Sequence, residues 1–315
     1  MNAFKHFRKY AFATLFLVLF SALDAAAQNQ TVRLPRASQK ASVMQTVGVT
    51  DVTITYSRPA VKGRKIWGDA PATAAASGTT TLDDARARAK DAPIVPYGHV
   101  WRTGANEATT FTVTDEVMIN GQKLTAGTYS LHTIPGKDEW TIIFNSDAGQ
   151  WGSFAYNEKK DVLRVKAKPM VVNENQEWLN FSVPMTTANS AQVLIRWEKV
   201  AVPFTVEIPN VETLMLTKVD TAMQANPTDW NVPLAVARQF SGDEKKDRAI
   251  TWADKSIKIK ETYQNLAFKT QMLAAAGRRD EALALADKAV ALGKTDKADT
   301  SRFEKWLTDY KAGKM

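Results

Sequence analysis

The chain has 315 residues, of which 44% are hydrophobic and 23% are charged, and it contains no cysteine. This composition is that of an ordinary globular protein, and it excludes collagen-like, disulfide-stapled and intrinsically disordered chains. The formal net charge is +8, but Lys and Arg form no run longer than two, so no nucleic-acid partner is expected. Without cysteine there can be no disulfide, thiol chemistry or cysteine-ligated zinc.

The N-terminus has the three parts of a secretory signal peptide. Lys5, Arg8 and Lys9 precede an apolar run over 11–20, and Ala25 and Ala27 supply the small residues of a cleavage site after position 27. The run is too short to cross a bilayer. We therefore expect an exported protein, periplasmic or secreted, with no membrane span once residues 1–27 are removed. The leader carries three Lys or Arg and one Asp, so the net charge falls to +6.

Residues 28–209 are predicted to form an antiparallel all-β domain, a sandwich or roll. Short runs rich in Val, Ile, Thr, Phe and Trp alternate with turn residues, as in strands. Asn120-Gly121 stands between two such runs and predicts a hairpin, because a type I′ turn needs positive φ at both central residues. The strands are expected at 52–56, 111–113, 117–119, 122–124, 128–133, 140–144, 162–167, 178–183, 193–197 and 204–208. Residues 69–92 interrupt the pattern and are interpreted as a surface insertion.

Residues 210–315 are predicted to be helical. The segment 248–256 realigns with 281–289 at a spacing of 33 residues, which is typical of helical-hairpin repeats such as the tetratricopeptide repeat. Gly277 and Gly293 are expected to end helices, and Ser241 with Glu244 predicts a capping box. A helical bundle without true repeats is the alternative. A repeat array would offer a groove to a protein partner.

Several reaction types are excluded by the motifs that are missing. The sequence has no glycine-rich phosphate loop opening a helix and no nucleophile elbow. Only His99 and His132 remain after the leader, so a zinc site with three histidines is impossible and a mixed site with carboxylates such as Glu107 is the one alternative left open. We predict neither a cofactor nor a metal.

Two predicted loops, 56–64 and 96–109, carry the densest polar chemistry, and loops at strand ends are where binding residues concentrate. If they converge, three arginines could clamp an anionic group, because the guanidinium pairs bidentately with carboxylate or phosphate. The alternative is structural: an ion pair of Arg102 with Glu107 would simply hold the loop closed. The candidate ligand-binding residues are Arg58, Arg64, His99, Trp101, Arg102, Asn106, Glu107 and His132.

Six of the nine tryptophans lie in the β domain. Trp140, Trp178 and Trp197 alternate with apolar residues inside predicted strands and are expected in the core. The other three stand in predicted loops and could form a ligand surface, such as an aromatic platform for a sugar: Trp67, Trp101 and Trp151.

These loops carry a resemblance to a known family. The matching peptides are Ser57-Arg58-Pro59, the run from Trp101-Arg102-Thr103-Gly104 through Ala105-Asn106-Glu107-Ala108, and Gly127-Thr128-Tyr129-Ser130-Leu131. Over about residues 40–208 the chain resembles the domain of unknown function 2911 family. The resemblance implies an exported bacterial β domain and no particular activity.

Three functions remain open from the sequence. The first is a ligand-binding or protein-interaction module of the bacterial cell envelope, with an anionic or carbohydrate ligand between the two loops. The second is a hydrolase acting on an envelope or nutrient polymer, in which Glu107 and a histidine serve as acid and base. The third is a purely structural envelope protein.

Overall fold

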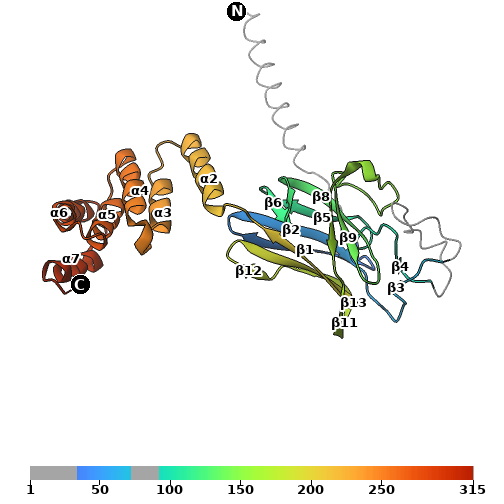
Figure 1. Cartoon of the computed structure of the whole chain (residues 1–315). Helices are drawn as coiled ribbons and strands as arrows, with labels where there is room; N and C mark the ends of the chain where they lie inside the picture. Colours follow the sequence, from blue (N-terminus) through green and yellow to red (C-terminus); the bar gives the residue numbers. More distant parts are fainter. Residues whose placement is uncertain (1–33, 72–91, 315) are drawn as a thin grey trace, which may run out of the picture.

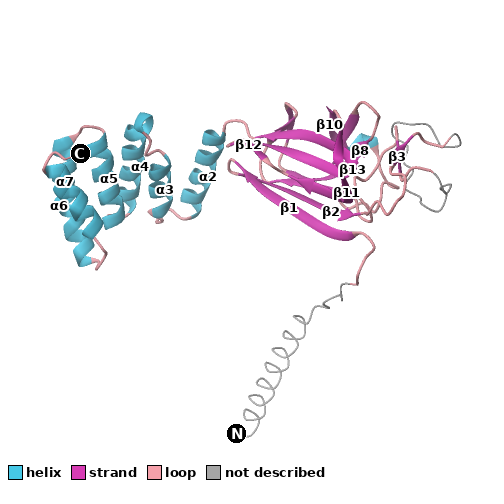
Figure 2. Ribbon diagram, turned by 90° about the horizontal axis from the view of Figure 1, so that it is seen from below, coloured by secondary structure: helices cyan, strands magenta, loops and turns pink. Residues whose placement is uncertain are grey.

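The computed structural model describes residues 34–71 and 92–314. The predicted signal peptide, 1–27, and most of the predicted insertion, 69–92, lie outside these residues. A β-sandwich comes first along the chain and an all-α region follows it (Figures 1 and 2). The predicted fold class, an antiparallel β domain followed by paired helices, is confirmed.

The first sheet of the sandwich has six antiparallel strands in the order β1-β2-β5-β8-β9-β10. Its outer face carries a row of small polar side chains that crosses five neighbouring strands, each residue being the cross-strand partner of the next. The row consists of Ser42, Thr55, Thr110, Ser130 and Asn145. The strands are β1 (Gln39–Val47), β2 (Thr50–Arg58), β5 (Thr109–Val113), β8 (Gly127–Ile134), β9 (Trp140–Asn145) and β10 (Asp161–Ala167).

The second sheet has the order β11-β13-β6-β7, with β12 paired to β13. Asn120 and Gly121 join β6 to β7 with φ of 45° and 79°, which confirms the predicted hairpin turn. A separate parallel pair, β3 (Trp67–Gly68) and β4 (Val95–Pro96), brackets the insertion. The strands of the second sheet are β6 (Val117–Ile119), β7 (Gln122–Leu124), β11 (Met170–Ser182), β12 (Met185–Thr187) and β13 (Ser190–Glu207).

One continuous core fills the space between the two sheets. Trp101 and Trp197 stack with ring centroids 5.8 Å apart, and Trp67 packs edge-on against both. Trp140 joins the same aromatic group. The core positions of Trp140 and Trp197 are confirmed, whereas that of Trp178 is wrong: it lies on the edge strand β11 and is 38% exposed.

The all-α region comprises α2 (Val211–Ala225), α3 (Asn231–Gln239), α4 (Lys246–Ile259), α5 (Tyr263–Ala275), α6 (Arg279–Thr295) and α7 (Ser301–Lys311). Consecutive helices pack on one another, most extensively α3 on α4, α4 on α5 and α5 on α6. Helix α2 joins the two regions, because Val211 and Leu214 pack against the sandwich core and Lys218 forms an ion pair with Asp115.

Several element boundaries differ from the sequence predictions. The segments 193–197 and 204–207 belong to the single strand β13, which continues past Glu198 despite its positive φ and ends one residue before the predicted position 208. Helix α6 runs through Gly293, where the glycine lets Thr300 and Tyr263 approach closely. The capping box predicted at Ser241 and Glu244 is wrong: α4 begins after a 3₁₀ turn.

Candidate functional site

The two polar loops meet at one end of the first sheet. Gly104 packs on the backbone of Ser57, so a Cβ at position 104 would lie 3.2 Å from the Ser57 carbonyl oxygen. The loop that contains Gly104 is fixed from inside: Trp101 Nε1 donates to the Gly104 carbonyl at 3.1 Å, and Thr109 Oγ1 donates to the Thr103 carbonyl at 2.8 Å. The two loops therefore meet through their backbones, which is the condition that the arginine clamp required.

Glu107 and Trp151 form an isolated antiparallel bridge between this loop and the β9–β10 connection. The Ala108 amide donates to the Gln150 carbonyl, and the Gly152 amide donates to the Asn106 carbonyl, both at 2.9 Å. These bonds flank the bridge, which makes Glu107 and Trp151 a non-hydrogen-bonded pair whose side chains lie close together on one face. Trp151 is 57% exposed, so its ring lies at the surface beside a carboxylate.

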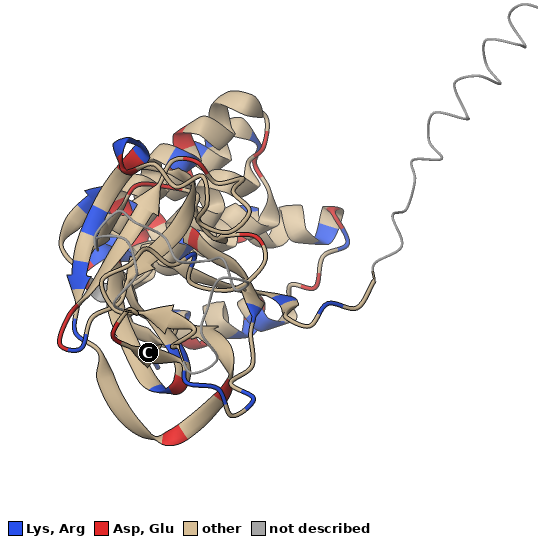
Figure 3. Ribbon diagram, turned by 90° about the vertical axis from the view of Figure 1, so that its right-hand side faces the viewer, with Lys and Arg blue, Asp and Glu red and all other residues tan. Residues whose placement is uncertain are grey.

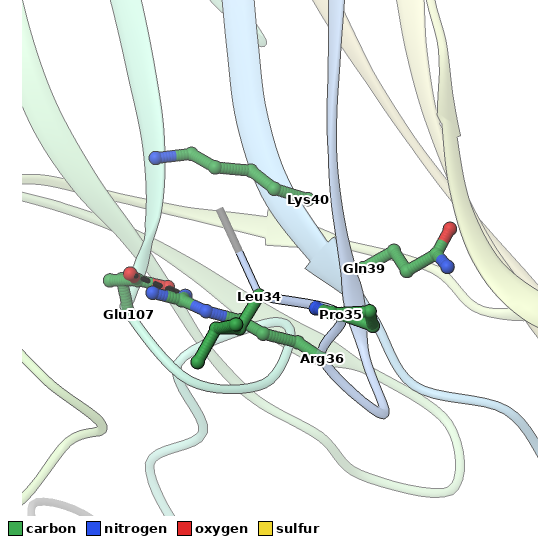
Figure 4. A pocket seen from close by; sticks show the side chains of 6 residues that line it. All are labelled: Leu34, Pro35, Arg36, Gln39, Lys40 and Glu107. Atoms are coloured by element: carbon green, nitrogen blue, oxygen red, sulfur yellow. Dashed lines mark hydrogen bonds and ion pairs between the residues drawn. The ribbon is translucent and has the colours of Figure 1, made fainter. Parts of the chain in front are cut away.

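Arg36 binds Glu107 across 71 residues of chain. Its Nη1 lies 2.7 Å from Oε1 and 2.9 Å from Oε2 of the carboxylate (Figure 4), and its guanidinium carbon lies 6.0 Å from the centroid of the Trp151 ring. The hydrogen bond from Arg36 holds the pKa of Glu107 below its ordinary value, although partial burial opposes the shift. Glu107 is therefore a carboxylate at neutral pH.

Two hollows adjoin this ion pair. The outer hollow, of about 470 Å³, is lined by the N-terminal segment Leu34–Arg36 together with Gln39, Lys40 and Glu107. The inner hollow, of about 170 Å³, shares Lys40 and Glu107, and Thr55, Ser57, Thr110 and Gln150 are among its other lining residues. Figure 4 shows the side chain of Lys40 extending on the same side as the Arg36–Glu107 pair. The two hollows thus meet at one carboxylate and one ammonium group.

Gln150 lies at the inner hollow and is almost fully buried, with 6% of its surface exposed. Its Nε2 donates to the Asp147 carbonyl at 3.0 Å and to Asn145 Oδ1 at 3.3 Å. These two acceptors fix which end of the amide is nitrogen. Its Oε1 is buried and has no hydrogen-bond partner among the described residues.

A polar network supports the β9–β10 connection that carries Gln150 and Trp151. Tyr156 and Arg164 both donate to Asp161 Oδ2 at 2.7 Å, and Asn145 Nδ2 donates to its other oxygen at 2.7 Å. Burial and the hydrogen bond to Asp161 raise the pKa of the Tyr156 hydroxyl, which therefore stays protonated and remains a donor. Charged and phenolic groups thus hold this connection in place, and Asn145 links them to Gln150.

A family model matches residues 38–206, more than half of the chain, and its description reads protein of unknown function (DUF2911). The chain belongs to this family. No curated protein matches the chain, and no solved structure matches it. The helical region follows the DUF2911 domain and lies outside the match.

In the DUF2911 domain two of the candidate arginines bind backbone carbonyls. Arg58 Nε donates to the Leu179 carbonyl at 2.9 Å. Arg64 donates to the carbonyls of Val61 and Ala60, inside its own turn. Arg58 therefore ties the end of β2 to β11, and Arg64 closes its own turn. The lining of the two hollows contains Arg36 and Lys40 where the sequence suggested an arginine clamp.

The other candidates divide between the site and the core of the domain. Glu107 lies at the site, and Asn106 next to it donates to the Ser38 carbonyl at 3.0 Å. Trp101 is 5% exposed and belongs to the aromatic core. His99 and His132 are 3% and 0% exposed, and the His132 ring packs on Tyr156.

Arg102 is half-buried, and Gly152 packs close to its Nη1. The ion pair that the sequence suggested for Arg102 with Glu107 is made instead by Arg36. Arg36 and Lys40 were missed because β1 was not predicted: Arg36 lies just before this strand and Lys40 lies in it, and single cations in an unassigned segment give no local signal.

The rest of the DUF2911 domain offers little alternative chemistry. Lys, Arg, Asp and Glu are mixed over the end of the sandwich that faces away from the helices (Figure 3). Within residues 34–71 and 92–314 no group of three or more His, Asp or Glu side chains could hold a metal ion. In the same ranges, every helix is too short or too polar to cross a bilayer.

Proposed function

We propose that this protein is an exported binding protein that holds a small hydrophilic ligand, anionic or carbohydrate, in the paired hollows around Glu107. The observation that carries the proposal is the sharing of Glu107 and Lys40 by both hollows, with Arg36 and the exposed Trp151 at the same place. A small number of polar groups that converge in a concave site is typical of small-molecule binding.

The protonation state of Glu107 supports binding over hydrolysis. A general acid must be protonated at the working pH, whereas the bond from Arg36 lowers the pKa of Glu107. The two histidines that a hydrolase would use lie in buried surroundings. A binding protein needs no proton transfer, and a fixed carboxylate suits it as a hydrogen-bond acceptor.

The binding function is tested by thermal unfolding of the full chain with panels of neutral oligosaccharides and of organic and inorganic anions. We expect at least one panel to raise the melting temperature of the wild type, and Glu107→Gln and Lys40→Ala to abolish that rise while shifting the unliganded melting temperature by about 2 °C or less. Lys123→Ala removes an exposed lysine on β7 and serves as the control. Stabilisation that persists in both site variants would refute this site.

Export is a separate part of the proposal and rests on the leader motif. Expression of the full chain in a bacterium, followed by fractionation and N-terminal sequencing, should yield a periplasmic or secreted protein that begins at Gln28. Recovery of the intact chain from the cytoplasm would contradict it.

The helical region is proposed to be tetratricopeptide-like and to dock a protein partner. Support comes from the 33-residue spacing, from the pairwise packing of the helices, and from Ala282, Ala286 and Ala289, which are fully buried where helices approach closely. Truncation after residue 226 keeps α2, which packs on the sandwich. This variant should keep ligand binding and lose a partner that the full chain captures from envelope extracts.

A further inference from the structure

We propose that the ligand of the paired hollows is a neutral, hydroxyl-rich molecule of the oligosaccharide class. In this arrangement one sugar ring packs on Trp151 and the next reaches Glu107 and the inner hollow. The inference rests on the proposed binding function and specifies its ligand. Three features of the described residues support it: an exposed aromatic ring, the balance of charge, and the polarity of the inner hollow.

The aromatic ring is the first feature. Trp151 is 57% exposed and Phe154, three residues along the same connection, is 59% exposed. Exposed apolar side chains that gather beside polar residues mark candidate binding surfaces, and these two aromatic residues lie on one connection next to the hollows. The face of a sugar ring carries C–H groups that pack on an indole, while its hydroxyls point outward. The cross-strand pairing of Trp151 with Glu107 places a carboxylate where such hydroxyls would lie.

The charges at the site do not form an anion clamp. Arg36 and Lys40 bring two positive charges, but Arg36 is already paired with both oxygens of Glu107, which leaves Lys40, among the described residues, as the unpaired cation of the lining beside a carboxylate that lines both hollows. An anionic ligand would lie against this negative charge, and a cationic ligand would lie against Arg36 and Lys40. A hydroxyl group can donate to the carboxylate and accept from an ammonium group, so it is compatible with both.

The inner hollow adds hydroxyl groups and a further acceptor. Ser57, Thr55 and Thr110 line it, and the last two belong to the polar row across the first sheet. The row continues to Ser130, whose buried Oγ has no partner among the described residues, as is true of Gln150 Oε1. A buried acceptor without a donor is costly. Gln150 lines the inner hollow, so a ligand hydroxyl or a water bound there is the candidate donor for its Oε1.

The experiment measures binding to the full chain by intrinsic tryptophan fluorescence and by calorimetry. The probes are cellotetraose, maltotetraose and xylotetraose as neutral oligosaccharides, and tetragalacturonate and inorganic phosphate as anions. We expect saturable binding of at least one neutral tetrasaccharide. Trp151→Ala and Glu107→Gln should each weaken it about tenfold or more, as for central contacts in other interfaces. Trp178→Ala is the matched control, because it removes another exposed tryptophan, on β11, and should leave the affinity unchanged.

The other outcomes separate this inference from the binding function. If only tetragalacturonate or phosphate binds, and Lys40→Ala abolishes that binding, the hollows bind a ligand but the ligand is anionic, which overturns the inference alone. If a neutral oligosaccharide binds equally well to Trp151→Ala and Glu107→Gln, the site is wrong and both proposals fail. Absence of binding by every probe, with only ordered water in the inner hollow of a crystal structure, also overturns both.

Discussion

The sandwich and the helical region are stabilised in different ways. The sandwich has one continuous core with contributions from both sheets and a group of four packed tryptophans. The helices instead share three smaller apolar clusters, each between neighbouring helices, in which alanines provide many of the fully buried positions. A single core made of contacts distant in sequence favours all-or-none unfolding. Stacked helices depend on nearest neighbours and can open in part.

The largest effect is expected from removing a tryptophan of the sandwich core. Trp197 is 1% exposed and packs against Trp67 and Trp101. Trp197→Ala should cost the sandwich about 3–5 kcal/mol. Urea unfolding followed by near-ultraviolet circular dichroism should show this loss, while the helical signal at 222 nm keeps its midpoint. Trp306→Ala, in the aromatic stack of α7, should lower the urea midpoint at 222 nm and leave the near-ultraviolet midpoint unchanged. A shift of both midpoints in either variant would mean that the two regions unfold together.

A smaller effect is expected from filling the close contact between α6 and the segment that precedes α7. A Cβ at position 293 would lie 2.9 Å from the Tyr263 ring and would overlap Thr300. Gly293→Ala should therefore destabilise the helical region by about 1–2 kcal/mol, since overpacking outweighs the gain in helix propensity. Gly242→Ala is the control, because nothing lies within 4 Å of its added methyl group. Equal stability of the two variants at 222 nm would contradict the close packing.

The junction between the regions should respond to pH. Asp115 accepts from Lys218 at 2.7 Å and from Thr50 and Thr114 at 2.9 Å. Burial raises the pKa of this carboxyl, but the three hydrogen bonds more than offset it and the net pKa is lowered. Its stabilising effect is therefore present above the ordinary pKa of about 3.9 and is lost as the pH falls through the lowered value.

Asp115→Asn should remove about 1 kcal/mol at neutral pH, because Lys218 is partly exposed and the pair is screened. It should also reduce the loss of unfolding free energy that the wild type shows as the pH falls into the acid range. Glu116→Gln, which alters an exposed ion pair with Lys123, is the matched control and should leave that side of the curve unchanged.

The smallest effect concerns the surface pair at the candidate site. Arg36 and Glu107 have side chains that are 48% and 37% exposed, so the pair should contribute less than about 1 kcal/mol to stability. Arg36→Ala should nevertheless raise the pKa of Glu107 towards its ordinary value, which carboxyl-detected NMR titration measures. Lys40→Ala should shift it less, because Lys40 acts on Glu107 through charge alone. An unchanged Glu107 pKa in Arg36→Ala would mean that the ion pair does not form in solution.

Features encoded within a few residues were predictable from the sequence. The Asn120-Gly121 turn follows from the φ angles that its residues permit, and the helices follow from their apolar spacing. Whether a tryptophan side chain is buried depends on its tertiary position. Trp178 has the same alternating pattern as Trp140, but it lies on an edge strand and is exposed to solvent. Position in the sheet order is not a local property of the sequence.

The candidate site was predictable only in part. Glu107 was identified from its polar loop, whereas its partner Arg36 lies 71 residues away and Gln150 lies 43 residues away on another connection. Residues of this kind come together only through strand register and loop packing, which a single sequence does not reveal. The arginines of the first polar loop, Arg58 and Arg64, have the right chemistry for a ligand but bind carbonyls of the protein.

The long strand β13 has a mechanical consequence. It runs from Ser190 to Glu207 in the second sheet, pairs with β11 between Leu194 and Ala201 and with β6 at Val206 and Glu207, and helix α2 begins four residues after its end. Tension applied to the helices would therefore enter the sandwich along the axis of an interior strand. Under such a pull the short pairing with β6 at Val206 and Glu207 would be loaded first, and the longer pairing with β11 would be loaded in shear behind it.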